Sequence, residues 1–400
     1  MTDEQPGFFA PGRSEGAYLP FRGRMTWRRL LTRLVLCAIM LVAVDALVAA
    51  TATSQASFER DYRLPRTMPT ADIADYADAI DASARSVAGG PVVLFLGASP
   101  TWGHRTKDAA NTFPYAFRSA AASAGVDVRA FNLASNGQFV GDYLVIARRL
   151  APDAEAVYVQ LTYHTFNRAA RGEAAIRYPE LPKVLGVTLS SDDAALLRLS
   201  GSDTGLLAQG ESWLGRYWRL WRARDAIDRA LLGGRPRDAL ERLAARAAGD
   251  EVTSDEDVTG DGFAAFDSLE PEQQMMAVAA YAEDSSFDIE PADSEVRALD
   301  RLAALLEQGE VPAVFYMAPL NRELIRSYEL IDEALYARNV EILRRVVEAR
   351  GATFIDYNSG PVRFGPGLFA DISHTTDAGG RVFGAALWND TSATVTAVAR

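Results

Sequence analysis

The chain has 400 residues, of which 48 % are hydrophobic, so it is long enough for one large domain or two ordinary ones. Its formal net charge of −12 comes from 41 basic and 53 acidic residues, without a long lysine or arginine tract, which argues against nucleic acid as the main partner. The single cysteine, Cys37, excludes an internal disulfide and a thiolate metal cluster. The three histidines are the only candidates for an imidazole base: His104, His164 and His374.

The amino-terminal region has the pattern of a membrane signal anchor. Residues 1–27 lack hydrophobic periodicity, whereas residues 34–52 form an apolar run whose only charge is Asp45. The length of this run is close to the ~20 residues that span a bilayer as a helix. The arginines that lead into it are Arg22, Arg24, Arg28, Arg29 and Arg33. Arginines and lysines that flank a membrane helix stay on its cytoplasmic side. We therefore expect a cytoplasmic tail over 1–27, a signal anchor over 28–52 and an extracytoplasmic remainder.

A cleaved secretory signal is the alternative, since the small residues at 50–52 resemble a cleavage site. The apolar run is longer than the ~7–15 residues of most such signals, which favours the anchor. Residues 53–90 then form a stalk or a peripheral helix before the main domain, 91–400. Within 70–87, the residues at helical spacing are Ile73, Tyr76, Ala77 and Ile80.

The main domain opens with an apolar run at 92–96 that predicts a strand buried on both faces. Gly97 and Gly103 bracket a turn after it, and Ser99 lies within that turn. In an open α/β sheet, ligands bind at the carboxyl ends of the strands, so Ser99 is a candidate nucleophile. The alternative is an ordinary turn whose serine only caps the following helix.

Strands and helices alternate through the rest of the domain. This order predicts an α/β fold with a parallel sheet that helices cover on both faces. The further strands expected are 128–133, 156–161, 311–318 and 353–356. The helices expected are 111–124, 142–150, 321–350 (one long helix or a pair) and 376–388.

Between the third and fourth strands, the sequence predicts a large helical insertion over about 170–308, because such connections are usually far shorter. An aromatic, arginine-flanked segment at 214–224 fits either packing against the sheet or docking at a membrane interface. The acidic segment 250–262 is similar to a calcium loop, but Phe266 stands where the required glutamate belongs. We therefore expect no metal and no cofactor.

A second candidate group lies near the carboxyl end, where Asp371 precedes His374 by three residues, ahead of a helix. At this spacing, the carboxylate can orient the imidazole, whose other nitrogen then takes a proton from a serine. The alternative is a solvent-exposed loop histidine. The position of this pair on the last loop of an α/β chain favours the catalytic interpretation.

Three segments together resemble the blocks of the SGNH (GDSL-type) hydrolase superfamily. Residues 97–103 (GASPTWG) resemble the first block, 132–137 (NLASNG) the second and 371–374 (DISH) the last. The resemblance implies a flavodoxin-like three-layer fold and acyl-ester chemistry. In that family's scheme, Ser99 is the nucleophile, His374 the base and Asp371 its orienting carboxylate, while the amides of Ser99 and Gly137 form an oxyanion hole.

Two positions depart from the family pattern. Ala98 replaces the usual aspartate before the serine, a residue outside the proton relay. The third block usually supplies an asparagine side chain after the third strand, and here His164 stands at that position, with Asn167 one helical turn later. Either side chain can donate a hydrogen bond to an oxyanion, and both stay candidates.

A single anchor before such a domain is similar to membrane-tethered polysaccharide O-acetyltransferases and to the D-alanyl-teichoic-acid transfer protein of bacteria. The resemblance implies an extracytoplasmic enzyme that moves an acyl group, expected to be acetyl, on a cell-surface or exported polysaccharide. It also implies a multi-spanning membrane acyltransferase as partner. The alternative is a catalytically inactive, membrane-tethered module that binds polymer or that partner, which Ala98 and the altered third block favour.

Overall fold

The computed structural model describes residues 27–52, 90–106, 109–168, 175–199, 265–282, 287–361 and 363–398, with the single residues Ile73, Ala77, Ile80, Asp81 and Ala84. The segments expected at 214–224 and 250–262 lie outside these residues. The chain divides into two units, 1–46 and 47–400.

The first unit contains most of α1 (Trp27–Ala52), a helix of 26 residues that covers the apolar run found in the sequence. Exposed apolar side chains on α1 include Leu34, Val35, Leu36, Ile39, Met40 and Val42. Among the residues that the structure describes, no helix has both the length and the apolar character required to cross a membrane. Membrane insertion of residues 34–52 stays a prediction.

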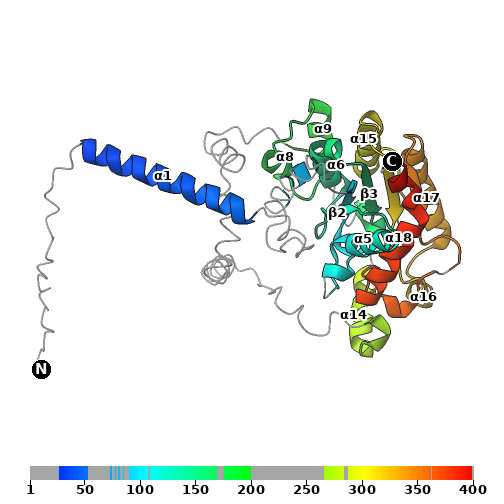
Figure 1. Ribbon diagram of the computed structural model, residues 1–400. Coiled ribbons are helices and arrows are strands. Elements are labelled where there is room, and N and C mark those ends of the chain that lie inside the picture. The colour runs from blue at the N-terminus through cyan, green and yellow to red at the C-terminus, as the bar shows by residue number, and fades with distance from the viewer. Residues whose placement is uncertain are drawn as a thin grey trace, which may run out of the picture. The chain divides into compact units, whose positions relative to one another are not determined.

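The second unit is built on a five-stranded, all-parallel sheet (Figure 1). Its strands are β1 (Val92–Leu96), β2 (Arg129–Asn132), β3 (Ala156–Leu161), β4 (Ala313–Met317) and β5 (Thr353–Asp356). They lie in the order β2-β1-β3-β4-β5, the order of flavodoxin-like doubly wound sheets. The α/β class with a parallel sheet, predicted from the alternation of elements, is confirmed.

Alternate side chains of the central strands enter two separate cores. Leu94 and Leu96 of β1 belong to one buried cluster, whereas Val93 and Phe95 belong to another. In β4, Phe315 joins the first cluster. Because both faces are buried, the strands consist of continuous apolar runs rather than alternating apolar and polar residues.

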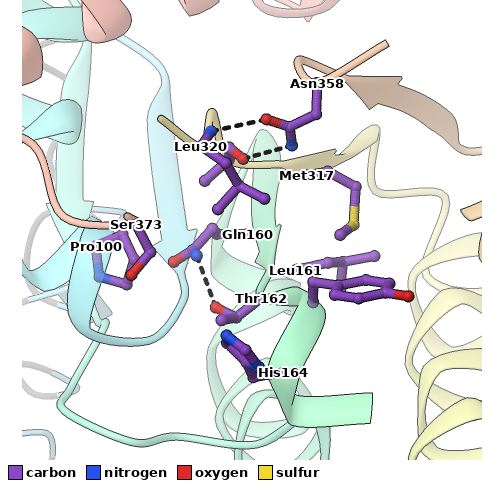
Figure 2. Close-up of a pocket in the computed structure, with 11 residues that line it drawn as sticks. Pro100, Gln160, Leu161, Thr162, His164, Met317, Leu320, Asn358 and Ser373 are labelled. Atoms are coloured by element: carbon purple, nitrogen blue, oxygen red, sulfur yellow. Dashed lines mark hydrogen bonds between the residues drawn. The ribbon is translucent and has the colours of Figure 1, made fainter. Parts of the chain in front are cut away.

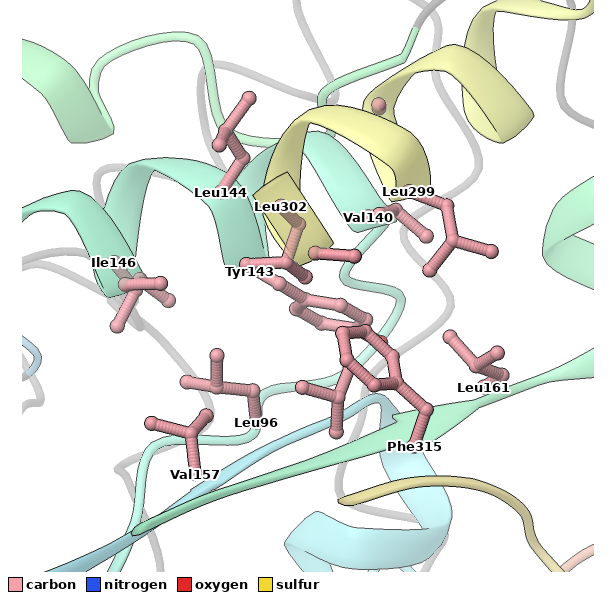
Figure 3. Close-up of a cluster of buried hydrophobic side chains, with 14 of the residues drawn as sticks. Leu96, Val140, Tyr143, Leu144, Ile146, Val157, Leu161, Leu299, Leu302 and Phe315 are labelled. Atoms are coloured by element: carbon pink, nitrogen blue, oxygen red, sulfur yellow. The ribbon is translucent and has the colours of Figure 1, made fainter. Parts of the chain in front are cut away.

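Helices cover both faces of the sheet. The first core packs beneath α6 (Val140–Leu150), α15 (Ser294–Gln308) and α17 (Glu333–Glu348), and Figure 3 shows Leu302 of α15 and Tyr143 of α6 meeting Phe315 of β4. The second core packs beneath α5 (Phe113–Ser123) and α18 (Asp377–Val398), which lie against each other. The arrangement has three layers, with the sheet in the middle.

Several predicted boundaries move. The expected helix 321–350 is a pair, α16 (Arg322–Ser327) and α17, and the closing helix extends to Val398. The expected strand 311–318 begins two residues later, at Ala313, because Pro312 has no N–H to give to a strand ladder. At the end of the predicted insertion, α15 packs on α6 and on the sheet, so it is the helix that connects β3 to β4.

The described parts of the long β3–β4 connection are short helical segments. They are η3 (Tyr163–Phe166), α8 (Leu181–Val184), α9 (Ser191–Leu196), η6 (Phe266–Ser268) and α14 (Pro271–Ala282), followed by α15.

The segment before the sheet packs on the domain. Ile73, Ala77 and Ile80 are helical and buried in the first core, and Asp81 pairs with Arg149 of α6. These residues therefore pack on the domain, while the interpretation of 53–90 as a stalk or a peripheral helix stays a prediction.

Candidate active site

The turn that carries Ser99 follows β1, which lies between β2 and β3. A Cβ at Gly97 would come within 2.7 Å of Thr101 Oγ1 and 2.8 Å of Gln160 Oε1, so the turn requires glycine at this position. Ser99 opens the short helix α4 (Ser99–Trp102), and its N–H therefore has no acceptor inside that helix. The N-cap position is Ala98, so the alternative of a helix-capping serine does not hold.

The loop that carries Asp371 and His374 precedes α18. An antiparallel bridge between Phe369 and Thr375 joins the two ends of this loop. Inside the bridge, the Ala370 N–H donates to the His374 carbonyl oxygen at 2.8 Å. These contacts close the segment into a tight loop, so its two functional side chains are held by backbone hydrogen bonds.

The structure brings Ser99, His374 and Asp371 into one hydrogen-bonded chain. His374 Nε2 lies 2.8 Å from Ser99 Oγ, and His374 Nδ1 lies 2.7 Å from Asp371 Oδ2. With the Nδ1 proton on the carboxylate side, Nε2 is the acceptor for the serine proton. This geometry is that of a nucleophile, a general base and a carboxylate that orients the base.

Asp371 is held as a carboxylate by its surroundings. Its Oδ1 accepts the backbone N–H groups of Ser373 at 2.9 Å and His374 at 2.7 Å, and Arg105 Nε lies 3.8 Å from Oδ2. Burial raises the pKa of Asp371, but the charge and hydrogen bonds of His374 and the Ser373 amide outweigh burial and lower the pKa to about 2. Asp371 is therefore an ionised carboxylate at neutral pH.

This lowered pKa predicts a pH-dependent contribution to stability. Because the folded pKa lies below the ordinary value of 3.8, the unfolded chain binds the proton more readily. Asp371 should stabilise the fold by about 2 kcal/mol above pH 4, and this contribution should be lost as the pH falls through 2. Urea unfolding of the wild type and of Asp371→Asn between pH 2 and 5 measures it. A stability gap that stays constant over that range would contradict the assignment.

The second predicted block lies beside the serine turn. Asn132, the last residue of β2, donates from Nδ2 to the Thr101 carbonyl oxygen at 3.0 Å, and the Ser135 N–H donates to the Gly97 carbonyl oxygen at 3.3 Å. Gly137 follows in a turn with φ +70°, a conformation that favours glycine. These contacts attach the Gly137 turn to the Ser99 turn, while the oxyanion role of the Gly137 amide stays a prediction.

The two candidates for the third block occupy different places. His164 lies in η3 and lines a cavity together with Pro100 and Ser373, the chain neighbours of Ser99 and His374 (Figure 2). Asn167 follows η3, is 4 % exposed and does not line that cavity. Of these two side chains, only that of His164 lines the cavity, and the oxyanion role of either residue stays a prediction.

Gln160 is a residue that the sequence did not single out. It lies in β3 and is 1 % exposed, and its Oε1 accepts from the Ala98 N–H at 3.1 Å and from Thr101 Oγ1 at 2.9 Å. Its Nε2 donates to Thr162 Oγ1 at 2.8 Å. Gln160 thereby links both sides of Ser99 to the end of β3. The available signal was a single amide side chain within an otherwise apolar strand, since such a group needs buried partners.

Replacing Gln160 with methionine should lower kcat while KM changes little. The variant leaves the Ala98 N–H without its acceptor, which costs about 1–3 kcal/mol and loosens the turn that positions Ser99. We expect kcat for ester hydrolysis to fall about tenfold or more. Leu343→Ala in α17 is the control, because it removes a buried side chain of the first core that does not belong to the turn. It should lower the Tm yet leave the kcat of folded protein unchanged, and equal kcat values for the two variants would assign Gln160 a merely structural role.

Within the described ranges, no group of three or more His, Cys, Asp or Glu side chains is arranged to hold a metal ion. A scan against protein-family models found no match for the chain, and a search of curated proteins found no relative.

Proposed function

We propose that the chain is an SGNH-type serine acyl-transfer enzyme that acts on acyl esters of a cell-surface or exported polysaccharide. The observation that carries this proposal is the hydrogen-bonded chain Ser99–His374–Asp371 at the carboxyl edge of a parallel sheet. The three sequence blocks and the strand order support the SGNH assignment and its flavodoxin-like, three-layer architecture.

In the first half of the reaction, Ser99 Oγ attacks the acyl carbonyl carbon and its proton passes to His374 Nε2. Asp371 stabilises the imidazolium that forms, because it remains a carboxylate. The tetrahedral intermediate collapses when the leaving oxygen takes the proton from His374. The acyl group is then an ester of Ser99, and the leaving alcohol is released.

In the second half, water or a sugar hydroxyl attacks the carbonyl carbon of this ester and gives its proton to His374. The bond between that carbon and Ser99 Oγ then breaks, and Oγ takes the proton back from His374. Water gives a free carboxylic acid, whereas a sugar hydroxyl gives a new polysaccharide ester. The negative charge on the carbonyl oxygen is stabilised by the amides of Ser99 and Gly137 and by His164, or by Asn167 in its place. Each such donor is worth about 10²–10³ in rate.

The cellular setting in this proposal comes from the sequence. Residues 34–52 attach the protein to the cell membrane, residues 1–27 stay in the cytoplasm, and the domain from 91 onward is extracytoplasmic. A multi-spanning membrane acyltransferase would deliver the acyl group. No cofactor or nucleic acid takes part.

Labelling by a serine-reactive fluorophosphonate tests the proposal on the full chain in detergent. The wild type should label and Ser99→Ala should not, because only an activated serine reacts. Ser123→Ala, which changes an exposed serine of α5, is the matched control and should label like the wild type. Absence of labelling in the wild type would favour an inactive module that binds polymer or a membrane partner. A second assay uses an acylated oligosaccharide as the acyl donor. Release of the free acid indicates a hydrolase, whereas appearance of an acylated acceptor indicates a transferase.

A further inference from the structure

A small cavity lies beside the Ser99–His374 pair, where β3 and β4 end (Figure 2). Pro100 and Ser373 form one end, next to the nucleophile and the base in the chain. Leu161 of β3 and Met317 of β4 form the opposite side. An acyl group attached to Ser99 would lie next to Pro100, one of the residues that line this cavity.

The walls of the cavity offer apolar surface to an occupant. They include Leu161, Met317, Ala318 and Leu320. Thr162, His164 and Ser373 also line the cavity, and Asn358 of the wall is bonded within the protein. Asn358 accepts the Leu320 N–H at 2.7 Å and donates to the Ala318 carbonyl oxygen at 2.9 Å.

Tyr163 also lines the cavity, and its hydroxyl group is bonded elsewhere in the protein. The hydroxyl oxygen accepts from Asn339 Nδ2 at 2.8 Å, and burial raises the pKa of Tyr163, so the group is a neutral phenol with a protein partner. A sugar hydroxyl placed against Leu161, Met317 and Leu320 would have no partner, which is costly. This side of the cavity therefore favours a hydrocarbon group.

The size of the cavity restricts that group further. Its volume of about 10 Å³ gives room for about one water molecule or one methyl group. Met317 is 1 % exposed and Leu320 is 8 % exposed, so both are packed on their far sides. Each further methylene would require these side chains to move, and close-packed interiors resist such movement.

We propose that this cavity receives the hydrocarbon end of the acyl group on Ser99 and limits it to two or three carbons, with Met317 and Leu320 as the residues that set the limit. The assignment rests on the proposed acyl-transfer function. It adds to that function the selection of the acyl chain by its length, with Met317 and Leu320 as the side chains that select.

Hydrolysis of a series of p-nitrophenyl esters by the full chain in detergent tests the assignment. For the wild type, kcat/KM should be at least about tenfold higher for acetate than for hexanoate, since one methylene in a filled pocket is worth about 10–200-fold. Met317→Ala and Leu320→Ala should each reduce this preference at least about tenfold by making room. Ala318→Val, which narrows the cavity, should lower the rate for propionate more than the rate for acetate.

The matched control is Met275→Ala, which truncates a methionine that is 56 % exposed on α14 and should keep the wild-type preference. Leu320 lies outside the strands, so its variant answers the question if Met317→Ala fails to fold. Equal rates along the series in the wild type, or an unchanged preference in the Leu320 variant, would overturn the cavity assignment and leave the acyl-transfer function standing. Absence of any Ser99-dependent turnover and labelling would overturn both.

Discussion

Replacing Ser99 with alanine is expected to lower kcat/KM for p-nitrophenyl acetate by about 10⁴-fold or more. Ser99 Oγ is the only hydroxyl hydrogen-bonded to His374 Nε2 among the described residues, so no second nucleophile stands ready to replace it. A loss of this size corresponds to about 5 kcal/mol of transition-state stabilisation. Ser99 makes no bond to the substrate before attack, so the loss should appear in kcat rather than in KM.

Stability should change little in this variant. Ser99→Ala removes one partly buried hydrogen bond and leaves the backbone contacts of α4 in place, including the Trp102 N–H to the Ala98 carbonyl oxygen at 3.1 Å. The Tm should therefore stay within a few degrees of the wild type. Steady-state kinetics with thermal melts on the same preparations test both statements. A folded Ser99→Ala protein that keeps a tenth of the wild-type activity would show that another residue performs the attack.

Local sequence was sufficient to predict the strands of the sheet. The runs 92–96 and 156–161 are bounded as predicted, because burial on both faces demands continuous apolar residues. The boundaries of α18 were less predictable. This helix extends ten residues beyond the predicted end at 388, where the chain becomes rich in threonine and alanine, and Val395 still packs in the second core. Tertiary packing decides such helix ends more than propensity does.

The site was predictable in its residue types but not in its supports. Ser99 and His374 are 275 positions apart, and they were linked by a resemblance rather than by any local pattern. The role of Gln160 depends on α4 folding back over β3, a tertiary contact without periodicity in the sequence. The different placement of His164 and Asn167 was not predictable either, because it follows from the turn geometry of η3.

Replacing Asp371 with asparagine is expected to lower kcat by about 10³–10⁴-fold. The carboxylate accepts the His374 Nδ1 proton at 2.7 Å and also the His374 N–H, so it fixes both the tautomer and the position of the ring. An amide group that presents its N–H₂ to Nδ1 favours the opposite tautomer, with the proton on Nε2, where it blocks acceptance of the serine proton. The same substitution removes the negative charge that stabilises the imidazolium.

The double variant Ser99→Ala/Asp371→Asn tests whether the two residues contribute to kcat together or independently. If Asp371 acts only through His374 on Ser99, adding Asp371→Asn to Ser99→Ala should reduce the remaining rate less than tenfold, although alone it costs about 10³-fold or more. The matched control is Asp300→Asn, which removes a carboxylate on α15 that is paired with Arg350. This variant should leave kcat unchanged. Additive losses in the double variant would contradict the relay, because Asp371 would then act on the substrate by a route that does not need the serine.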